Sequence, residues 1–361
     1  MTNLDKLEDL LRKGEKEKAY ELVKEDKGIT AEILIHEGIS FGIIGEYSIS
    51  ISYLVLAEKI AEDESIKEVA REELAVAYYN RGNAYVKLKE SERAMEDYSK
   101  AIELNPNLAE AYNNRGNGYY ELKESERAIE DYSRAIELNP NLAKVYYNRG
   151  VAYGEQKEYE RAIEDYNKAI ELNPKYADAY NNRGVAYGEQ KEYERAIKDF
   201  SKAIELNPKY AVAYENRGIT QLQTNEELEK AIEDFKHARD LSEGRDKERM
   251  LGFIEWAKAR GEMTMKNWVG FRERMNEARD IFERIGDPLS HSIDAFIKFS
   301  YLDEKLDNAL SIPKPIEALT KIEEALRNLP EVEGLIDPER AIFGARIDTF
   351  TILRDFVGKG Q

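Results

Sequence analysis

The side chains that most often perform catalysis or hold metals are scarce in this sequence. Three histidines are scattered at positions 36, 237 and 291, without the spacing of a zinc-ligand pair. The absence of cysteine excludes thiolate metal ligands and disulfides. Three glycines between positions 38 and 45 lie in a helical pattern and are not followed by the Gly-Lys-Ser/Thr of a phosphate-binding loop. The sequence therefore predicts no catalytic centre, no metal site and no cofactor.

Polar side chains that can bind a partner recur instead in two columns, each with a step of 34 residues. Because an amide carries both donor and acceptor, a column of asparagines can hold a peptide backbone whatever its sequence. The asparagines are Asn80, Asn114, Asn148, Asn182 and Asn216. The next residue is arginine each time, and acidic residues follow later in each repeat. Because a buried guanidinium must be paired, we expect these arginines to form ion pairs within or between repeats rather than to bind anions.

The columns belong to a motif that the chain repeats five times, in 78–107, 112–141, 146–175, 180–209 and 214–243. Apolar residues at three- and four-residue spacing predict two helices in each copy, with a turn between them. Asn-Pro pairs such as Asn105-Pro106 end the second helix, because the residue before proline avoids the helical region. A glycine recurs in the first helix, beginning at Gly82. Its cost of about 1 kcal/mol against alanine predicts a close approach by the neighbouring helix.

The segment before the five copies is also helical in pattern. Residues 1–30 predict two short helices around Gly14, and residues 31–64 predict a degenerate copy of the repeat. Ser65 to Glu68 resembles a capping box, which would start a helix that continues into the first clear copy.

Helical patterns also follow the five copies. A helix pair is predicted soon after residue 245, the second-helix pattern returns in 314–330, and a last helix from about 338 to 356 is suited to cap the array. Trp256 and Trp268 are expected to anchor the core of this region. The predicted division of the chain is 1–74, 75–244 and 245–361.

The chain is strongly acidic, with a net charge of −18. Residues 1–74 hold 18 acidic and 10 basic side chains. We find no basic patch for a nucleic-acid backbone, no apolar run of ~18 residues that would span a membrane, and no signal peptide. We therefore expect a cytoplasmic protein whose partner is another protein, neutral or basic, and neither a nucleic acid nor a membrane.

With this period, and with aromatic residues, glycine, alanine and proline at fixed offsets, the chain resembles the tetratricopeptide repeat family. The resemblance is strong in 75–242 and partial in 31–64 and 299–332. It implies an all-α fold in which antiparallel helix pairs stack into a right-handed superhelical solenoid, here with degenerate repeats at both ends. It also implies a concave groove, lined by the first helices, that binds a peptide or helical segment of a partner. The protein would thus be a non-catalytic scaffold for protein interactions.

The resemblance places one set of first-helix side chains in that groove. They are Tyr79, Asn80, Asn83, Asn113, Asn114, Asn117, Tyr120, Lys144, Tyr147, Asn148, Asn181, Asn182 and Asn216. The tyrosines offer rigid rings that both pack and hydrogen-bond. Glutamates at 121, 155 and 189 would make an acidic edge that favours a ligand with Lys or Arg. A second interpretation stays open, in which asparagine is the family's common residue at these places and only helps local packing.

Other functions also stay open. Asn83, Asn114 and Lys144 match three of the five positions with which some family members clamp the carboxylate tails of heat-shock chaperones, although Tyr79 and Asn148 replace cations of that clamp. As a structural component, the chain would use its C-terminal helices to bind a second copy of itself or a larger complex. As a sensor or effector, it would bind a small ligand in 245–361. The groove could also be filled by the chain's own last helix.

Overall fold

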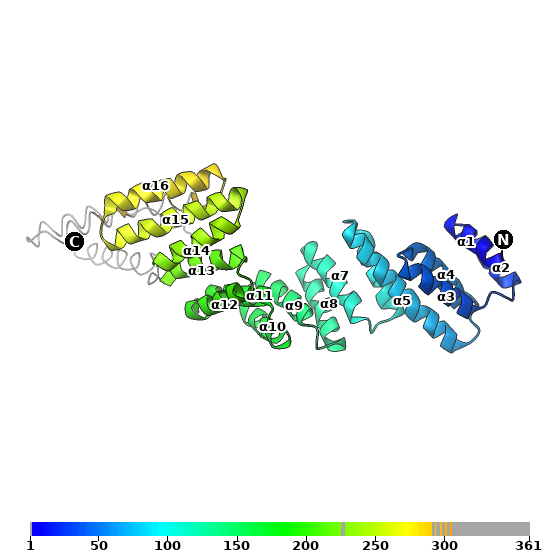
Figure 1. The fold of residues 1–361 in the computed structure, drawn as a ribbon. Helices are drawn as coiled ribbons and strands as arrows, with labels where there is room; N and C mark the ends of the chain where they lie inside the picture. Colours follow the sequence, from blue (N-terminus) through cyan, green and yellow to red (C-terminus); the bar gives the residue numbers. More distant parts are fainter. Residues whose placement is uncertain are drawn as a thin grey trace, which may run out of the picture. The chain divides into compact units, whose positions relative to one another are not determined.

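The computed structural model describes residues 2–224 and 228–290, together with the single positions 293, 297, 300, 301 and 304. Within that part of the chain every regular element is an α-helix, and sixteen helices follow one another as packed pairs (Figure 1). The predicted all-α fold of helix pairs is confirmed. The helices form two compact units, residues 1–174 and 175–361, which we describe in turn. The division of the chain at 74 and 244 stays a prediction.

The first unit contains ten helices. They are α1 (Asn3–Arg12), α2 (Lys16–Glu25), α3 (Ala31–Ile43), α4 (Tyr47–Ile60), α5 (Glu64–Lys87), α6 (Ser91–Leu104), α7 (Ala109–Glu121), α8 (Ser125–Leu138), α9 (Ala143–Glu155) and α10 (Tyr159–Leu172). From α3 onward each odd-numbered helix packs on the next helix, and α4, α6 and α8 also contact the pair that follows. The two short N-terminal helices, the degenerate pair in 31–64 and the lengthened helix α5 are all as the sequence predicts.

The start of α5 differs from the predicted capping box. The N-cap is Asp63, whose carboxylate accepts the backbone N–H of Ser65 at 2.8 Å and also the Ser65 hydroxyl. The hydrogen bond from that hydroxyl is the main cause that lowers the pKa of Asp63. An ionised carboxylate is a stronger acceptor than a hydroxyl and is favoured by the helix dipole at an N-terminus. Asp63 therefore takes the capping role that the sequence pattern assigned to Ser65.

The second unit contains six helices among the described residues. They are α11 (Ala177–Glu189), α12 (Tyr193–Leu206), α13 (Ala211–Thr224), α14 (Leu228–Leu241), α15 (Gly244–Thr264) and α16 (Trp268–Arg284). The last two confirm the helix pair predicted after residue 245. The predicted segment 314–330 and the predicted cap helix of 338–356 lie outside the described residues, as does the side chain of Trp268.

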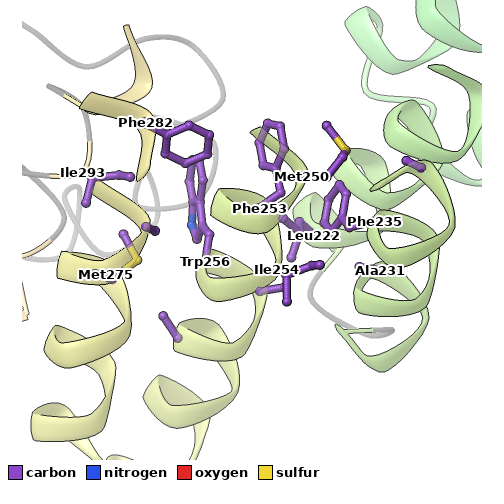
Figure 2. Packing of buried hydrophobic residues seen from close by; sticks show 14 of the residues in the cluster. Leu222, Ala231, Phe235, Met250, Phe253, Ile254, Trp256, Met275, Phe282 and Ile293 are labelled. Atoms are coloured by element: carbon purple, nitrogen blue, oxygen red, sulfur yellow. The ribbon is translucent and has the colours of Figure 1, made fainter. Parts of the chain in front are cut away.

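A large aromatic core holds helices α13 to α16 together. Figure 2 shows Phe253 and Trp256 of α15 between Phe282 of α16 and Leu222 and Phe235 of the preceding pair. The Phe253 ring stacks on Phe235 with 5.2 Å between centroids, and it meets Phe282 edge-on at 5.4 Å. Trp256 is buried, so its predicted role as a core anchor is confirmed.

The recurring glycine of the first helix lies directly against a buried ring of the second helix. A Cβ atom on Gly82 would stand 2.7 Å from the Tyr98 ring, a distance that Cβ atoms essentially never show. The same contact recurs at 2.7 to 2.8 Å between Gly116 and Tyr132, Gly150 and Tyr166, Gly184 and Phe200, and Gly218 and Phe235. The predicted close approach is confirmed. The nearest group is a side-chain ring, and at Gly116 and Gly150 the backbone carbonyl oxygens of Ala128 and Ala162 lie 3.3 Å from the Cβ position.

The same contact identifies degenerate pairs at both ends. In the α3–α4 pair a Cβ atom on Gly38 would lie 2.7 Å from Leu54, and in the α15–α16 pair one on Gly252 would lie 2.6 Å from Phe282. The turn inside α15–α16 contains Lys266 at φ 58°, and lysines at the matching turns of the first four clear copies have φ of 61 to 64°. Packing and turn geometry therefore continue where the sequence motif fades.

Two glycines of α11 give a direct test of this contact. We expect Gly184→Ala to lower the free energy of unfolding by roughly 1–3 kcal/mol, because the new methyl group overpacks against the Phe200 ring. Gly188 has no atom within 4 Å of its ideal Cβ position, so Gly188→Ala is expected to stabilise the protein by up to about 1 kcal/mol through helix propensity. Urea unfolding of both variants measures the difference. Equal effects of the two substitutions would contradict the packing role of Gly184.

Candidate binding surface

The predicted groove residues lie on α5, α7 and α9 in the first unit and on α11 and α13 in the second. We call the side of these helices that carries the asparagine column the first-helix face. Lys144 is exposed on it, and Tyr79, Tyr120 and Tyr147 are partly exposed. Asn113 and Asn181 are instead buried, at 8% and 3% exposure. The surface that a partner can reach is therefore smaller than the predicted set.

In the first unit, the asparagine column connects neighbouring repeats. Asn114 Nδ2 donates to Asn83 Oδ1 of the preceding repeat at 2.8 Å. Asn148 Nδ2 donates in the same way to Asn117 Oδ1 at 3.0 Å and to Asn113 Oδ1 at 3.1 Å. The side-chain N–H groups of Asn114 and Asn148 are thus used in hydrogen bonds within the protein. The second interpretation of the column, local packing, thus has direct geometric support.

Tyrosines of the second helices join the same network. Tyr98 donates its hydroxyl to Asn83 Oδ1 at 2.8 Å, and Tyr132 donates to Asn117 Oδ1 at 2.8 Å. A single amide oxygen therefore accepts two hydrogen bonds, one from the tyrosine hydroxyl of its own repeat and one from the asparagine of the next repeat. Sequence reasoning missed this role, although the signal was present, since Asn83 and Asn117 directly follow the packing glycines.

The second unit makes the same kind of link as Asn148 makes to Asn113. Asn216 Nδ2 donates to Asn181 Oδ1 at 3.0 Å, and Asn181 Nδ2 donates to Asn182 Oδ1 at 3.0 Å. Val185 stands at the position of Asn83 in α11 and offers no side-chain acceptor, so the link uses Asn181, the counterpart of Asn113. The column therefore connects repeats in both units.

The predicted acidic edge is partly neutralised where it meets a tyrosine. Tyr120 donates its hydroxyl to Glu155 Oε1 at 2.5 Å, and Lys123 Nζ lies 3.6 Å from the same oxygen. Burial, together with the hydrogen bond to Glu155, raises the pKa of Tyr120. A partner that approaches Glu155 therefore meets a carboxylate already held by two neighbours.

The arginine column is structural, as expected. Each arginine makes two parallel hydrogen bonds, at 2.7 to 2.8 Å, to a buried aspartate of its own second helix: Arg81 to Asp97, Arg115 to Asp131, Arg149 to Asp165, Arg183 to Asp199 and Arg217 to Asp234. A serine of the preceding second helix also accepts from the guanidinium of Arg81, Arg115, Arg149 and Arg217, at 2.9 to 3.4 Å. This column is therefore not a free anion-binding stripe.

Among the described residues, no group of histidine and carboxylate side chains has the geometry of a metal site. In the same part of the chain, no helix is long and apolar enough to cross a membrane.

Comparison with protein-family models identifies the family of this chain. Two tetratricopeptide repeat models match the chain, one at residues 75–108, 143–176 and 177–210 and the other at 98–130, and a TPR repeat model matches 116–157. The chain is therefore a tetratricopeptide repeat protein with motifs across residues 75–210. The resemblance predicted from the sequence is confirmed.

Several solved structures are similar to part of the chain. The crystal structure of MamA is 28% identical, with 44% of this chain and 93% of that chain covered and a TM-score of 0.42. YrrB, described as a TPR protein with an unusual peptide-binding site, is 26% identical, with coverages of 50% and 91% and a TM-score of 0.43. PilF of Pseudomonas aeruginosa is 20% identical, with coverages of 59% and 94% and a TM-score of 0.49. No curated protein matches the sequence.

We expect the loss of a buried ion pair to lower the free energy of unfolding much more than the loss of an exposed pair. In Asp131→Ala the half-buried guanidinium of Arg115 loses its partner, so we expect a loss of about 3 kcal/mol or more in the free energy of unfolding. Glu171→Ala removes an exposed pair with Lys168 and should cost less than about 1 kcal/mol. Urea unfolding at neutral pH compares the two. Similar losses would show that the arginine column contributes no more than surface pairs.

The hydrogen bond between Tyr98 and Asn83 also predicts that the stability of the fold falls at alkaline pH. Burial raises the pKa of Tyr98 to about 12, so the stability that its neutral hydroxyl contributes is full below about pH 10 and is lost as the pH rises towards 12. At pH 8, Tyr98→Phe should cost about 1 kcal/mol through the lost hydrogen bond to Asn83. Wild type should lose its advantage over Tyr98→Phe between pH 10 and 12, as followed by urea unfolding. An advantage that stays constant over this range would contradict the assignment.

Proposed function

We propose that this chain binds a segment of another protein on its first-helix face and performs no reaction itself. Tetratricopeptide repeat domains generally mediate protein interactions and are generally non-catalytic, and this chain carries their repeats across residues 75–210. The main support for this proposal is that different residues of the first-helix face have different roles. Asparagines fix the repeats to one another, while Lys144 and the rings of Tyr79, Tyr120 and Tyr147 remain at least partly exposed.

This arrangement suits recognition of an extended or helical segment. The rings are amphipathic and rigid, so little entropy is lost when they contact a partner. They stand on helices whose spacing is set by the packing glycines and by the asparagine network, which preorganises the surface before binding. The glutamates at 121, 155 and 189 are exposed, and with a chain charge of −18 they favour a neutral or basic segment.

The amide network changes how the proposal is tested. Alanine at Asn114, Asn148 and Asn182 would remove links within the chain as well as contacts to a partner, so loss of binding in that triple variant would be ambiguous. Lys144, which is exposed, and Tyr120, which is partly exposed and bonded to Glu155 rather than to an asparagine, are the better targets. Tyr120→Ala with Lys144→Ala changes the first-helix face, and Lys168→Ala with Tyr193→Ala changes second helices as a matched control.

We expect the full chain to select peptides from a phage-displayed library of random dodecamers. Synthetic peptides from that selection should bind the Tyr120→Ala, Lys144→Ala variant at least about tenfold more weakly, because contact residues of this kind each contribute more than 1 kcal/mol. The control variant should stay within about twofold of wild type. Fluorescence anisotropy measures affinity, and circular dichroism checks that each variant is folded. Equal affinities of all three proteins, or no selected peptide, would overturn the proposal.

A further inference from the structure

Asn80, the first member of the asparagine column, differs from the other four. The later members at 114, 148, 182 and 216 all take part in hydrogen bonds with other asparagines. The side-chain amide of Asn80 has no hydrogen-bond partner among the residues that the structure describes, and Asn80 is partly exposed. The cause lies in the preceding helix. Ile39 directly follows the packing glycine of α3, at the position where Asn83 and Asn117 accept in later repeats, and an isoleucine offers no acceptor.

The same replacement creates a small apolar pocket beside Asn80. The pocket lies between α3, α4 and α5, has a volume of about 150 Å³, and is lined by Ile39, Ile43, Leu54 and Val76 as well as Asn80 and Glu73. Ile39, Ile43 and Val76 are 36%, 80% and 41% exposed. A cavity of roughly this size holds a benzene molecule, so one branched or aromatic side chain fits it. Large apolar side chains gathered at the mouth of a pocket are typical of an interaction site.

The wall of the pocket carries one acidic side chain. This is Glu73, which forms no ion pair with any described residue. Three cations of α5 are already paired with other residues: Lys67 with Glu64 at 3.7 Å, Arg71 with Glu58 at 2.7 Å and Arg81 with Asp97 at 2.7 Å. A cation on the partner would therefore complete the site, whereas a carboxylate would be repelled.

From these three features we infer that this pocket is the anchoring point for a partner segment in which a bulky apolar residue stands next to a lysine or arginine. The apolar side chain enters between Ile39, Ile43 and Val76. The Asn80 amide, which can both donate and accept, pairs with the backbone of the segment, and Glu73 pairs with the cation. This inference rests on the proposed function, because it assigns the partner's chemistry at the N-terminal end of the first-helix face.

The dodecamer selection on the full chain tests this assignment. We expect selected peptides to share Leu, Ile, Val or Phe within two residues of Lys or Arg. A synthetic peptide with that pattern should bind Ile43→Glu at least about tenfold more weakly and Asn80→Ala about threefold more weakly than wild type. Val212→Glu is the matched control, since Val212 is 50% exposed on α13 and outside the pocket, and it should leave affinity unchanged.

A charge exchange gives a readout that mere destabilisation would not produce. Selection on Glu73→Lys should replace the Lys or Arg beside the apolar residue with Asp or Glu, while the apolar residue itself is kept. An unchanged preference, or full affinity of Ile43→Glu, would overturn the inference. If Tyr120→Ala with Lys144→Ala weakens binding but Ile43→Glu does not, the inference falls and the proposed function stands. If neither weakens it, or the library yields no binder, both fall.

Discussion

Packing in this protein depends on a buried side chain pressed against a glycine backbone in each repeat. Because the ring of Tyr98 lies only 2.7 Å from the place where a Cβ of Gly82 would be, only glycine lets the two helices of the pair approach this closely. The contact also fixes their register. Arg81 directly precedes Gly82 and Asp97 directly precedes Tyr98, so the same approach brings guanidinium and carboxylate to 2.7 Å. A charge can be buried here because the packing contact holds its partner in place.

The ring also explains how one repeat is tied to the next. The hydroxyl of Tyr98 reaches Asn83, which then accepts from Asn114 of the following repeat. In the fourth and fifth copies the ring belongs to phenylalanine, which has no hydroxyl, and the link passes through Asn181 and Asn216 instead. Packing within a repeat and pairing between repeats are thus one connected network. Such a network favours a rigid surface, which is the property that a binding scaffold needs.

The network determines which polar groups are left for a partner. Most amides of the column are spent on links within the chain, so exposed rings, Lys144 and the glutamates dominate the middle of the first-helix face. At the N-terminal end, Ile39 interrupts the network and leaves the Asn80 amide beside an apolar pocket. The degenerate repeat in 31–64 therefore has features of its own that the clear copies lack. Its differences from the repeat motif, such as Ile39, give the N-terminal end of the first-helix face a different chemistry.

The helix pairs, the family, the packing glycines and the pairing of the arginines could all be predicted from the sequence alone, because a 34-residue period places the same few side chains in the same surroundings each time. The sequence did not determine which atoms the asparagines bind. An amide can serve a neighbour or a ligand equally well, and only the distance from Asn114 to Asn83 decides between them. Nor did the sequence indicate the pocket, since Ile39, Leu54 and Val76 come from three helices and meet only when these pack. Tertiary structure decided both, because each depends on contacts between residues that are distant along the chain.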